Sequence, residues 1–192
     1  MEKDEHKEGK KYNPNQHLFV HCPGCGQATL TPATEKSFSC GACQFVFYLN
    51  CAAACIAVIV NEKNQLLVTQ RKQDPFKGKL DLPGGFAEPG ESIEQSLIRE
   101  IKEELDLDII RLKYLCSFPN TYPYKSVVYP VTDMAFICDV KTFDTIKARD
   151  DIENYFFMDL LGLDKNLFGL ASPKKVIETY LDISTPGQSP IL

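Results

Sequence analysis

The chain has 192 residues, of which 44% are hydrophobic and 24% charged, as in a globular protein with one ordinary domain and a small accessory module. The net charge of −5 argues against a general nucleic-acid binder, which needs a basic face to displace counterions from phosphates. No apolar run reaches the roughly 18 residues that span a bilayer, and the charged N-terminus lacks the apolar centre of a signal peptide. We therefore expect a cytoplasmic protein without a membrane partner.

The chain begins with a polar, lysine-rich stretch, residues 1–16, which we interpret as a disordered leader. Residues 17–50 follow, with short strand-like segments and two Cys-x2-Cys pairs. Without an export signal, metal binding explains such pairs better than disulfides, and the alternative of unrelated core cysteines is disfavoured. This pattern resembles a zinc ribbon, whose structural Zn²⁺ would be bound by four thiolates. The expected ligands are Cys22, Cys25, Cys40 and Cys43.

The main domain is expected over residues 51–185, and its pattern predicts a mixed α+β class. Capping-box spacing between Ser92 and Gln95 and an apolar stripe predict one helix over residues 92–105. A second helix is expected near the C-terminus, with Ser172 as its N-cap. The remaining cysteines (Cys51, Cys55, Cys116 and Cys138) are expected to be small core residues. The strands are expected at 52–60 and 65–70, which would form a hairpin, and at 112–118, 127–140 and 155–158.

The first of these helices carries the chemistry. Glu100, Glu103 and Glu104 are three or four positions apart, so they share one face and repel one another. Bound Mg²⁺ or Mn²⁺ would offset this repulsion, because hard cations prefer carboxylate oxygens. Glutamates on a helix are by themselves more often a solvated acidic face, so the surrounding pattern decides. That pattern includes the Leu-Pro-Gly-Gly turn at 82–85, the upstream Glu91 and an adjacent arginine.

Together these residues resemble the Nudix box, G-x5-E-x7-R-E-U-x-E-E-x-G-U with U aliphatic, and the similarity extends over most of residues 52–182. The resemblance implies a Nudix α/β/α sandwich and a pyrophosphohydrolase. One position departs from the pattern, because Asp106 stands where the family has a glycine that terminates the helix. The metal ligands that the resemblance implies are Gly85, through its carbonyl, Glu91, Glu100, Glu103 and Glu104, and the catalytic residues are Glu103, Glu104 and Arg99.

Some members of the family carry their general base on a later loop. Residues Asp150, Asp151 and Glu153 fall at such a place, although a solvated loop is the favoured interpretation for them. Which acidic residue is the base therefore stays open.

A zinc ribbon before a Nudix domain resembles the NADH pyrophosphatase branch. Residues 117–126 are similar to a motif of that branch in their serine, proline and aromatic content, but they have one extra residue and no tryptophan. Aromatic side chains here could stack on a base or simply pack in a loop. The substrate-binding residues that we predict are Arg71, Phe118, Tyr122 and Tyr124.

We therefore predict an enzyme that depends on a divalent cation and cleaves the diphosphate of a nucleoside diphosphate linked to another group, such as ADP-ribose or NADH. One alternative is a nucleoside-triphosphate pyrophosphohydrolase, and another is a Nudix fold that senses a ligand without catalysis. The expected partner is a small nucleotide-type substrate, and whether the protein is a homodimer stays open.

Overall fold

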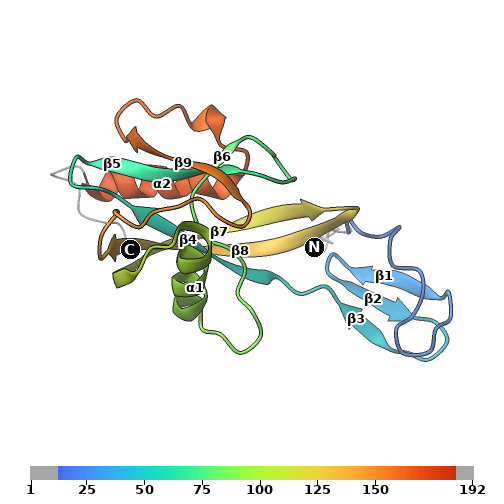
Figure 1. Cartoon of the computed structure of the whole chain (residues 1–192). Helices are drawn as coiled ribbons and strands as arrows, with labels where there is room; N and C mark the ends of the chain where they lie inside the picture. Colours follow the sequence, from blue (N-terminus) through green and yellow to red (C-terminus); the bar gives the residue numbers. More distant parts are fainter. Residues whose placement is uncertain (1–12, 185–192) are drawn as a thin grey trace, which may run out of the picture. The chain divides into compact units, whose positions relative to one another are not determined.

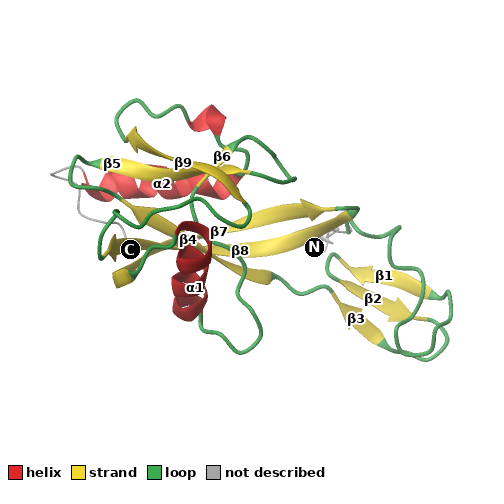
Figure 2. Cartoon of the chain, in the orientation of Figure 1, coloured by secondary structure: helices red, strands yellow, loops and turns green. Residues whose placement is uncertain are grey.

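The structure is a computed structural model that describes residues 13–184. Strands make up most of the ordered elements, with two long helices and one short 3-10 helix, η1 (Figures 1 and 2). The elements in chain order are β1 (Leu30–Thr34), β2 (Ser37–Cys40), β3 (Val46–Tyr48), β4 (Ala52–Ile59), β5 (Gln65–Arg71), β6 (Leu80–Asp81), α1 (Ile93–Leu105), β7 (Ile109–Tyr124), β8 (Val127–Val140), β9 (Ile152–Asp159), η1 (Lys165–Leu167) and α2 (Ala171–Ser184).

Contacts between residues divide the chain into two compact units. Among the described residues, the first contains residues 13–50 together with Pro123–Tyr129, the turn between β7 and β8 and its flanks. The second contains Cys51–Tyr122 together with residues 130–184.

The first unit is built on an antiparallel sheet in the order β1-β2-β3. Its small core is the fully buried Phe38, against which the rings of Phe19 and Phe47 pack at 5.2 and 6.1 Å between centroids. The first twelve residues of the expected leader lie outside the described residues. Its last residues are not a free tail, because Asn15 is buried and exchanges two hydrogen bonds with the backbone of Val128.

The second unit contains two three-stranded sheets, ordered β4-β8-β7 and β6-β5-β9. Strand β4 runs parallel to β8, with Ala52 opposite Val131, whereas β5 pairs antiparallel with β6 and β9. The hairpin predicted between β4 and β5 is therefore wrong as a continuous ladder. The two strands meet in a single bridge between Val60 and Leu66 and then diverge into different sheets.

Two hydrophobic clusters lie on opposite faces of β4. Cys55, Ala57 and Ile59 pack with the apolar stripe of α1 in one cluster. The alternate residues Ile56 and Val58 pack with Val176 and Ile177 of α2 in the other. Because successive side chains of a strand point to opposite faces, both faces of β4 are covered and its sequence is a continuous apolar run. The arrangement confirms the expected α/β/α sandwich (Figure 1).

The ends of the helices differ in how well they follow the prediction. Helix α1 begins after Ser92, whose capping box with Gln95 is formed as expected. Helix α2 begins at Ala171, so Ser172 lies inside its first turn and is not the N-cap that we predicted.

Of the four remaining cysteines, Cys55 and Cys138 are buried, Cys116 is half-buried and Cys51 is exposed. No helix within residues 13–184 is long and apolar enough to cross a bilayer.

Candidate active site

Helix α1 carries the glutamates and is fixed in direction by its N-terminal cap. The Ser92 side chain accepts a hydrogen bond from the Gln95 N–H at 3.2 Å, and the Gln95 side chain accepts from the Ser92 N–H at 2.8 Å. This exchange satisfies two of the donors that a helix N-terminus leaves without partners. Leu97, Ile101 and Leu105 are fully buried beneath the helix, so the opposite side faces outward with the charged residues.

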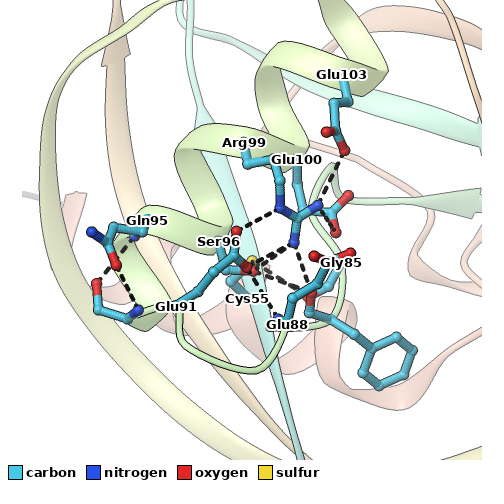
Figure 3. Close-up of polar contacts among 11 residues, drawn as sticks. Cys55, Gly85, Glu88, Glu91, Gln95, Ser96, Arg99, Glu100 and Glu103 are labelled. Atoms are coloured by element: carbon cyan, nitrogen blue, oxygen red, sulfur yellow. Dashed lines mark hydrogen bonds and ion pairs between the residues drawn. The ribbon is translucent and has the colours of Figure 1, made fainter.

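Arg99 lies at the centre of the carboxylate cluster (Figure 3). Its guanidinium pairs with both carboxylate oxygens of Glu91 at 2.7 and 2.9 Å, with Glu100 at 2.9 Å and with Glu103 at 3.1 Å. The Arg99 contact lowers the pKa of Glu91 to about 2, so this carboxyl is ionised near neutral pH. A fifth hydrogen bond, from Arg99 to the carbonyl of Phe86 at 3.1 Å, ties the helix to the preceding loop. Arg99 therefore offsets repulsion among three carboxylates and orients them.

Glu104 lies apart from this arginine-bound group. Its residue is only 8% exposed, and its side chain accepts a hydrogen bond from the Gly84 N–H at 3.1 Å. No arginine or lysine pairs with it among the described residues. Burial raises the pKa of Glu104 well above its usual value, and the nearby charge of Glu100 acts in the same direction. Such a carboxyl favours the neutral form unless a positive charge is brought close to it.

The Gly84–Gly85 turn approaches both β4 and the helix so closely that neither position has room for a side chain. A Cβ at Gly85 would lie 2.5 Å from the carboxyl of Glu100. The Gly85 carbonyl accepts hydrogen bonds from the Cys55 N–H at 2.8 Å and from the Cys55 thiol at 3.3 Å, and a thiol is a weak donor that a cation could displace. Carboxylates gathered around a glycine carbonyl form an all-oxygen donor set that suits Mg²⁺ or Mn²⁺. The residues present therefore fit the divalent cation that the resemblance implies.

Asp106, which departs from the box, preserves the turn that a glycine would make. It occupies the left-handed region at φ 56° and ψ 30°, and its N–H donates to the Lys102 carbonyl as the C-cap of α1. Its carboxylate also pairs with Lys102 at 3.0 Å and with Arg149 at 2.8 Å. Asp106 thus ends the helix as a glycine would, and its ion pair with Arg149 joins the helix to the loop before β9.

That loop carries the acidic residues considered as an alternative base. The N–H groups of Lys147 and Arg149 donate to the carbonyls of Leu105 and Glu104 at 3.0 and 2.8 Å. The charge of Asp150 raises the pKa of Glu104, which places Asp150 within electrostatic reach of the cluster. The Asp151 side chain instead accepts from Gln73 at 2.8 Å, and Glu153 is exposed.

A pocket opens beside the Gly84–Gly85 turn and contains two of the four predicted substrate residues. Arg71 pairs with Asp81 at 2.7 Å and donates to the Tyr122 hydroxyl at 3.2 Å, with its guanidinium 5.8 Å from the Tyr122 ring centroid. The Tyr122 ring makes an edge-to-face contact with Phe86 at 5.2 Å. Asp81 offsets the positive charge of Arg71. Through its bonds to Asp81 and Tyr122, Arg71 also holds the wall of the pocket in place. The lining residues are Ala54, Cys55, Ile56, Arg71, Asp81, Leu82, Gly84, Gly85, Phe86, Asn120, Tyr122, Val131, Asp133, Leu170, Ser172 and Pro173.

The other two predicted substrate residues lie elsewhere. Phe118 packs in the cluster beneath α2, with Lys175 Nζ 5.5 Å from its ring centroid, and does not line the pocket. Tyr124 belongs to the first unit, is 49% exposed and has Lys125 Nζ 5.3 Å from its ring centroid. Phe118 and Tyr122 are four positions apart on β7, so their side chains point to the same face of the strand, and both are half-buried. The sequence motif therefore did not reveal which of them lines the pocket.

Sequence reasoning missed several pocket residues. Asp81 could have been found, because it directly precedes the Leu-Pro-Gly-Gly turn. Asn120, Asp133 and Ser172 come from three separate elements and meet only in the folded chain, so no local pattern identified them.

The four ribbon cysteines meet within the first unit. Their sulfur atoms all lie within 4.8 Å of one another, close enough to share one metal ion. The Gly24 N–H donates to the sulfur of Cys22 at 3.3 Å. A contact with the Thr29 hydroxyl at 3.2 Å lowers the pKa of Cys40 to about 6. The neighbouring sulfurs, acting against a backbone hydrogen bond with Phe45, raise the pKa of Cys43 to about 12, so a bound metal would have to displace the proton of that thiol.

Comparison with known proteins decides the family. The model of the NUDIX domain matches residues 50–180. The chain belongs to the Nudix family. It is 38% identical over 141 residues to a Methanocaldococcus jannaschii protein named ADP-ribose pyrophosphatase, covering 72% of this chain and 78% of that one. It is also 31% identical over 118 residues to a Vibrio atlanticus protein named NAD-capped RNA hydrolase NudC, covering 62% of this chain and 41% of that one.

The chain is also similar to a solved structure. That structure is of a bifunctional NMN adenylyltransferase/ADP ribose pyrophosphatase from Francisella tularensis, complexed with AMP and a manganese ion. The match has a TM-score of 0.53 and 26% identity, and it covers 71% of this chain and 42% of that one. The family model and the curated relatives confirm the expected enzyme class, a Nudix hydrolase.

Proposed function

We propose that this Nudix hydrolase cleaves the diphosphate of ADP-ribose, or of a closely similar nucleoside diphosphate linked to a sugar, with Mg²⁺ or Mn²⁺. The observation that carries the proposal is the position of the box. Glu100 and Glu104 lie against the Gly84–Gly85 turn, and the same turn forms one wall of a pocket with the aromatic side chains of Phe86 and Tyr122. A substrate with its nucleoside in that pocket would bring its diphosphate to the carboxylates.

Each residue of the box has a distinct part in the proposed reaction. Glu100, Glu103 and Glu104, with the Gly85 carbonyl, would hold the cations, and Arg99 keeps Glu91, Glu100 and Glu103 in place. When bound, Mg²⁺ or Mn²⁺ supplies charge neutralisation of the diphosphate and activation of water. Water is consumed as one P–O bond is broken, so ADP-ribose would yield AMP and ribose 5-phosphate. Glu103 is the most exposed of the three, with half of its side chain accessible, and is the most open to incoming water.

Two further parts of the proposal rest on the relatives. We favour ADP-ribose as the substrate because of the relative named ADP-ribose pyrophosphatase, from Methanocaldococcus jannaschii. The match covers 78% of that protein, whereas the chain spans only 41% of the Vibrio NudC. Four thiols close enough to share one metal ion favour Zn²⁺ there, and residues 17–50 would form a structural module in addition to the catalytic domain. A closed four-thiolate site has no position left for substrate.

The test is a product assay on ADP-ribose, NADH and a nucleoside triphosphate, each with Mg²⁺, with Mn²⁺ and with a chelator. We expect ADP-ribose to give AMP and ribose 5-phosphate in the presence of either cation. Glu103→Gln should lower turnover at least ~10²-fold while the fold survives. Glu94→Gln is the matched control, because Glu94 is an exposed glutamate on the same helix, outside the Arg99 cluster.

Near-normal turnover by folded Glu103→Gln would remove Glu103 from the site. Preference for the triphosphate over both diphosphate substrates would replace the proposal by its alternative, a nucleoside-triphosphate pyrophosphohydrolase. No turnover of any of the three, with tight binding of one, would make the protein a sensor.

A further inference from the structure

The pocket that Arg71 and Asp81 line also contains a second buried carboxylate, that of Asp133. Asp133, on β8, is only 6% exposed. It forms no ion pair with any lysine, arginine or histidine of the described residues. A buried charge without a partner is expensive, so its environment must compensate by hydrogen bonds.

Those hydrogen bonds all go to one oxygen. The Asn120 amide donates to Oδ2 of Asp133 at 2.8 Å, and the Ser172 hydroxyl donates to the same Oδ2. The second N–H of the Asn120 amide reaches the Ser172 hydroxyl oxygen at 3.2 Å. These three side chains come from β7, β8 and the first turn of α2, and they fix the plane of the carboxylate. Ser172, which we predicted as the N-cap of α2, thus has a different role, because its hydroxyl donates a hydrogen bond to Asp133.

The other oxygen, Oδ1, is left for a ligand. It has no hydrogen-bond partner among residues 13–184. In that part of the chain, every fully enclosed side-chain oxygen or nitrogen does have a hydrogen-bond partner. Oδ1 is therefore not fully enclosed, and Asp133 lines the pocket. A carboxylate oxygen in such a place accepts a hydrogen bond and repels another oxygen.

The rest of the lining shows which part of a nucleotide fits. Phe86 and Tyr122 present ring surfaces, and Ile56, Leu82, Val131 and Pro173 add apolar side chains. The other polar side chains of the lining bond one another, and the apolar and aromatic side chains around them suit a nucleobase better than a ribose, whose several hydroxyls would need more polar partners. A base that carries an amino group would satisfy Oδ1.

We propose that Oδ1 of Asp133 accepts a hydrogen bond from the amino group of adenine, and that Asp133, held by Asn120 and Ser172, selects adenine over hypoxanthine in the substrate. The inference rests on the proposed function, in which this pocket holds the nucleoside. In hypoxanthine the amino group is replaced by a carbonyl, whose oxygen would face the Asp133 oxygen. A site built around a hydrogen-bonding group rejects the analogue that lacks its partner far more strongly than an apolar pocket does.

The test compares kcat/KM for ADP-ribose and for its hypoxanthine analogue in the parent protein, Asp133→Asn and Asp139→Asn. An asparagine can turn either its carbonyl or its N–H toward the base, so it no longer discriminates. We expect the parent to prefer ADP-ribose by at least ~10-fold, and Asp133→Asn to reduce that ratio by at least ~10-fold. Asp139→Asn is the matched control on the same strand, because Asp139 pairs with Arg111 and does not line the pocket. It should keep the parent ratio.

An equal loss on both substrates in folded Asp133→Asn would overturn the proposal, since a contact to ribose or a structural role would act on both alike. A second measurement needs no variant. The parent should bind AMP at least ~10-fold more tightly than IMP, and equal affinities would overturn the proposal even if Asp133→Asn fails to fold. If the parent hydrolyses neither diphosphate but still separates AMP from IMP, the proposed function fails and the selection by Asp133 stands.

Discussion

Replacement of Gly84 by alanine tests whether the turn before the box is held as tightly as the structure indicates. Gly84 has a φ of +142°, a conformation that side chains rarely adopt, and a Cβ there would lie 2.1 Å from the carbonyl oxygen of Cys55. That oxygen belongs to the backbone of β4 in the centre of the domain, so it cannot move aside as a flexible side chain would. The backbone of the turn must shift instead, which also strains the hydrogen bond from Gly84 to Glu104.

The size of the effect follows from two terms. A residue forced into such a backbone conformation costs about 1–3 kcal/mol. Overpacking against an unyielding neighbour costs roughly 1–3 kcal/mol more. Gly90 separates the two terms, because its φ is +95° but a Cβ there would meet nothing within 4 Å. Gly90→Ala should show the first term alone.

The assay is thermal unfolding followed by circular dichroism, with turnover measured on the same samples. At about 4 °C per kcal/mol for a domain of this size, Gly84→Ala should unfold roughly 4–12 °C below Gly90→Ala. It should also lose turnover, because Glu104 loses its donor. Equal melting temperatures for the two variants would refute the close approach of the turn to β4.

Three other predictions concern the two metal sites. Gly85→Ala should keep the fold but lower turnover at least ~10-fold, because the new Cβ meets the movable Glu100 carboxyl at 2.5 Å rather than backbone; unchanged turnover would contradict this. Because burial raises the pKa of Glu104, cation binding should release a proton, and Mg²⁺ affinity should rise with pH until Glu104 is ionised. Calorimetry in buffers of different ionisation enthalpy measures that proton, and its persistence in Glu104→Gln would argue for another source. Elemental analysis should find one zinc per chain, lost as pH falls and reduced in Cys43→Ser, whereas a metal-free parent with reactive thiols would exclude a structural metal.

Patterns within a short stretch of sequence were enough to predict much of the catalytic helix. The capping box of Ser92 and Gln95, the buried stripe beneath α1 and the shared face of the glutamates all depend on residues a few positions apart. The left-handed cap at Asp106 was not predicted, because the sequence showed only a departure from the family's glycine, although aspartate tolerates that conformation. The ribbon cysteines meet because two tight turns face each other across one small sheet.

What the sequence did not reveal depends on distant pairing. The parallel ladder of β4 with β8 joins residues about eighty positions apart, and it decides that β4 does not form a hairpin with β5. Ser172 has the spacing and chemistry of an N-cap, but its hydroxyl is used by Asp133, 39 positions away. Phe118 and Tyr122 look alike in a motif, and only the packing of α2 separates a core residue from a pocket residue. Tertiary contacts override local preference at these positions.

The central claim is that cations on the Nudix box hold the diphosphate of the substrate. Its most direct test is calorimetric titration of a non-hydrolysable ADP-ribose analogue with and without Mg²⁺, in the parent and in Glu104→Gln. A diphosphate is repelled by Glu100 and Glu104 unless cations lie between them, so ligand and Mg²⁺ should tighten each other's binding by one common factor. We predict a factor of at least ~10 in the parent and a much smaller one in Glu104→Gln. Equal affinity under all four conditions would contradict the account.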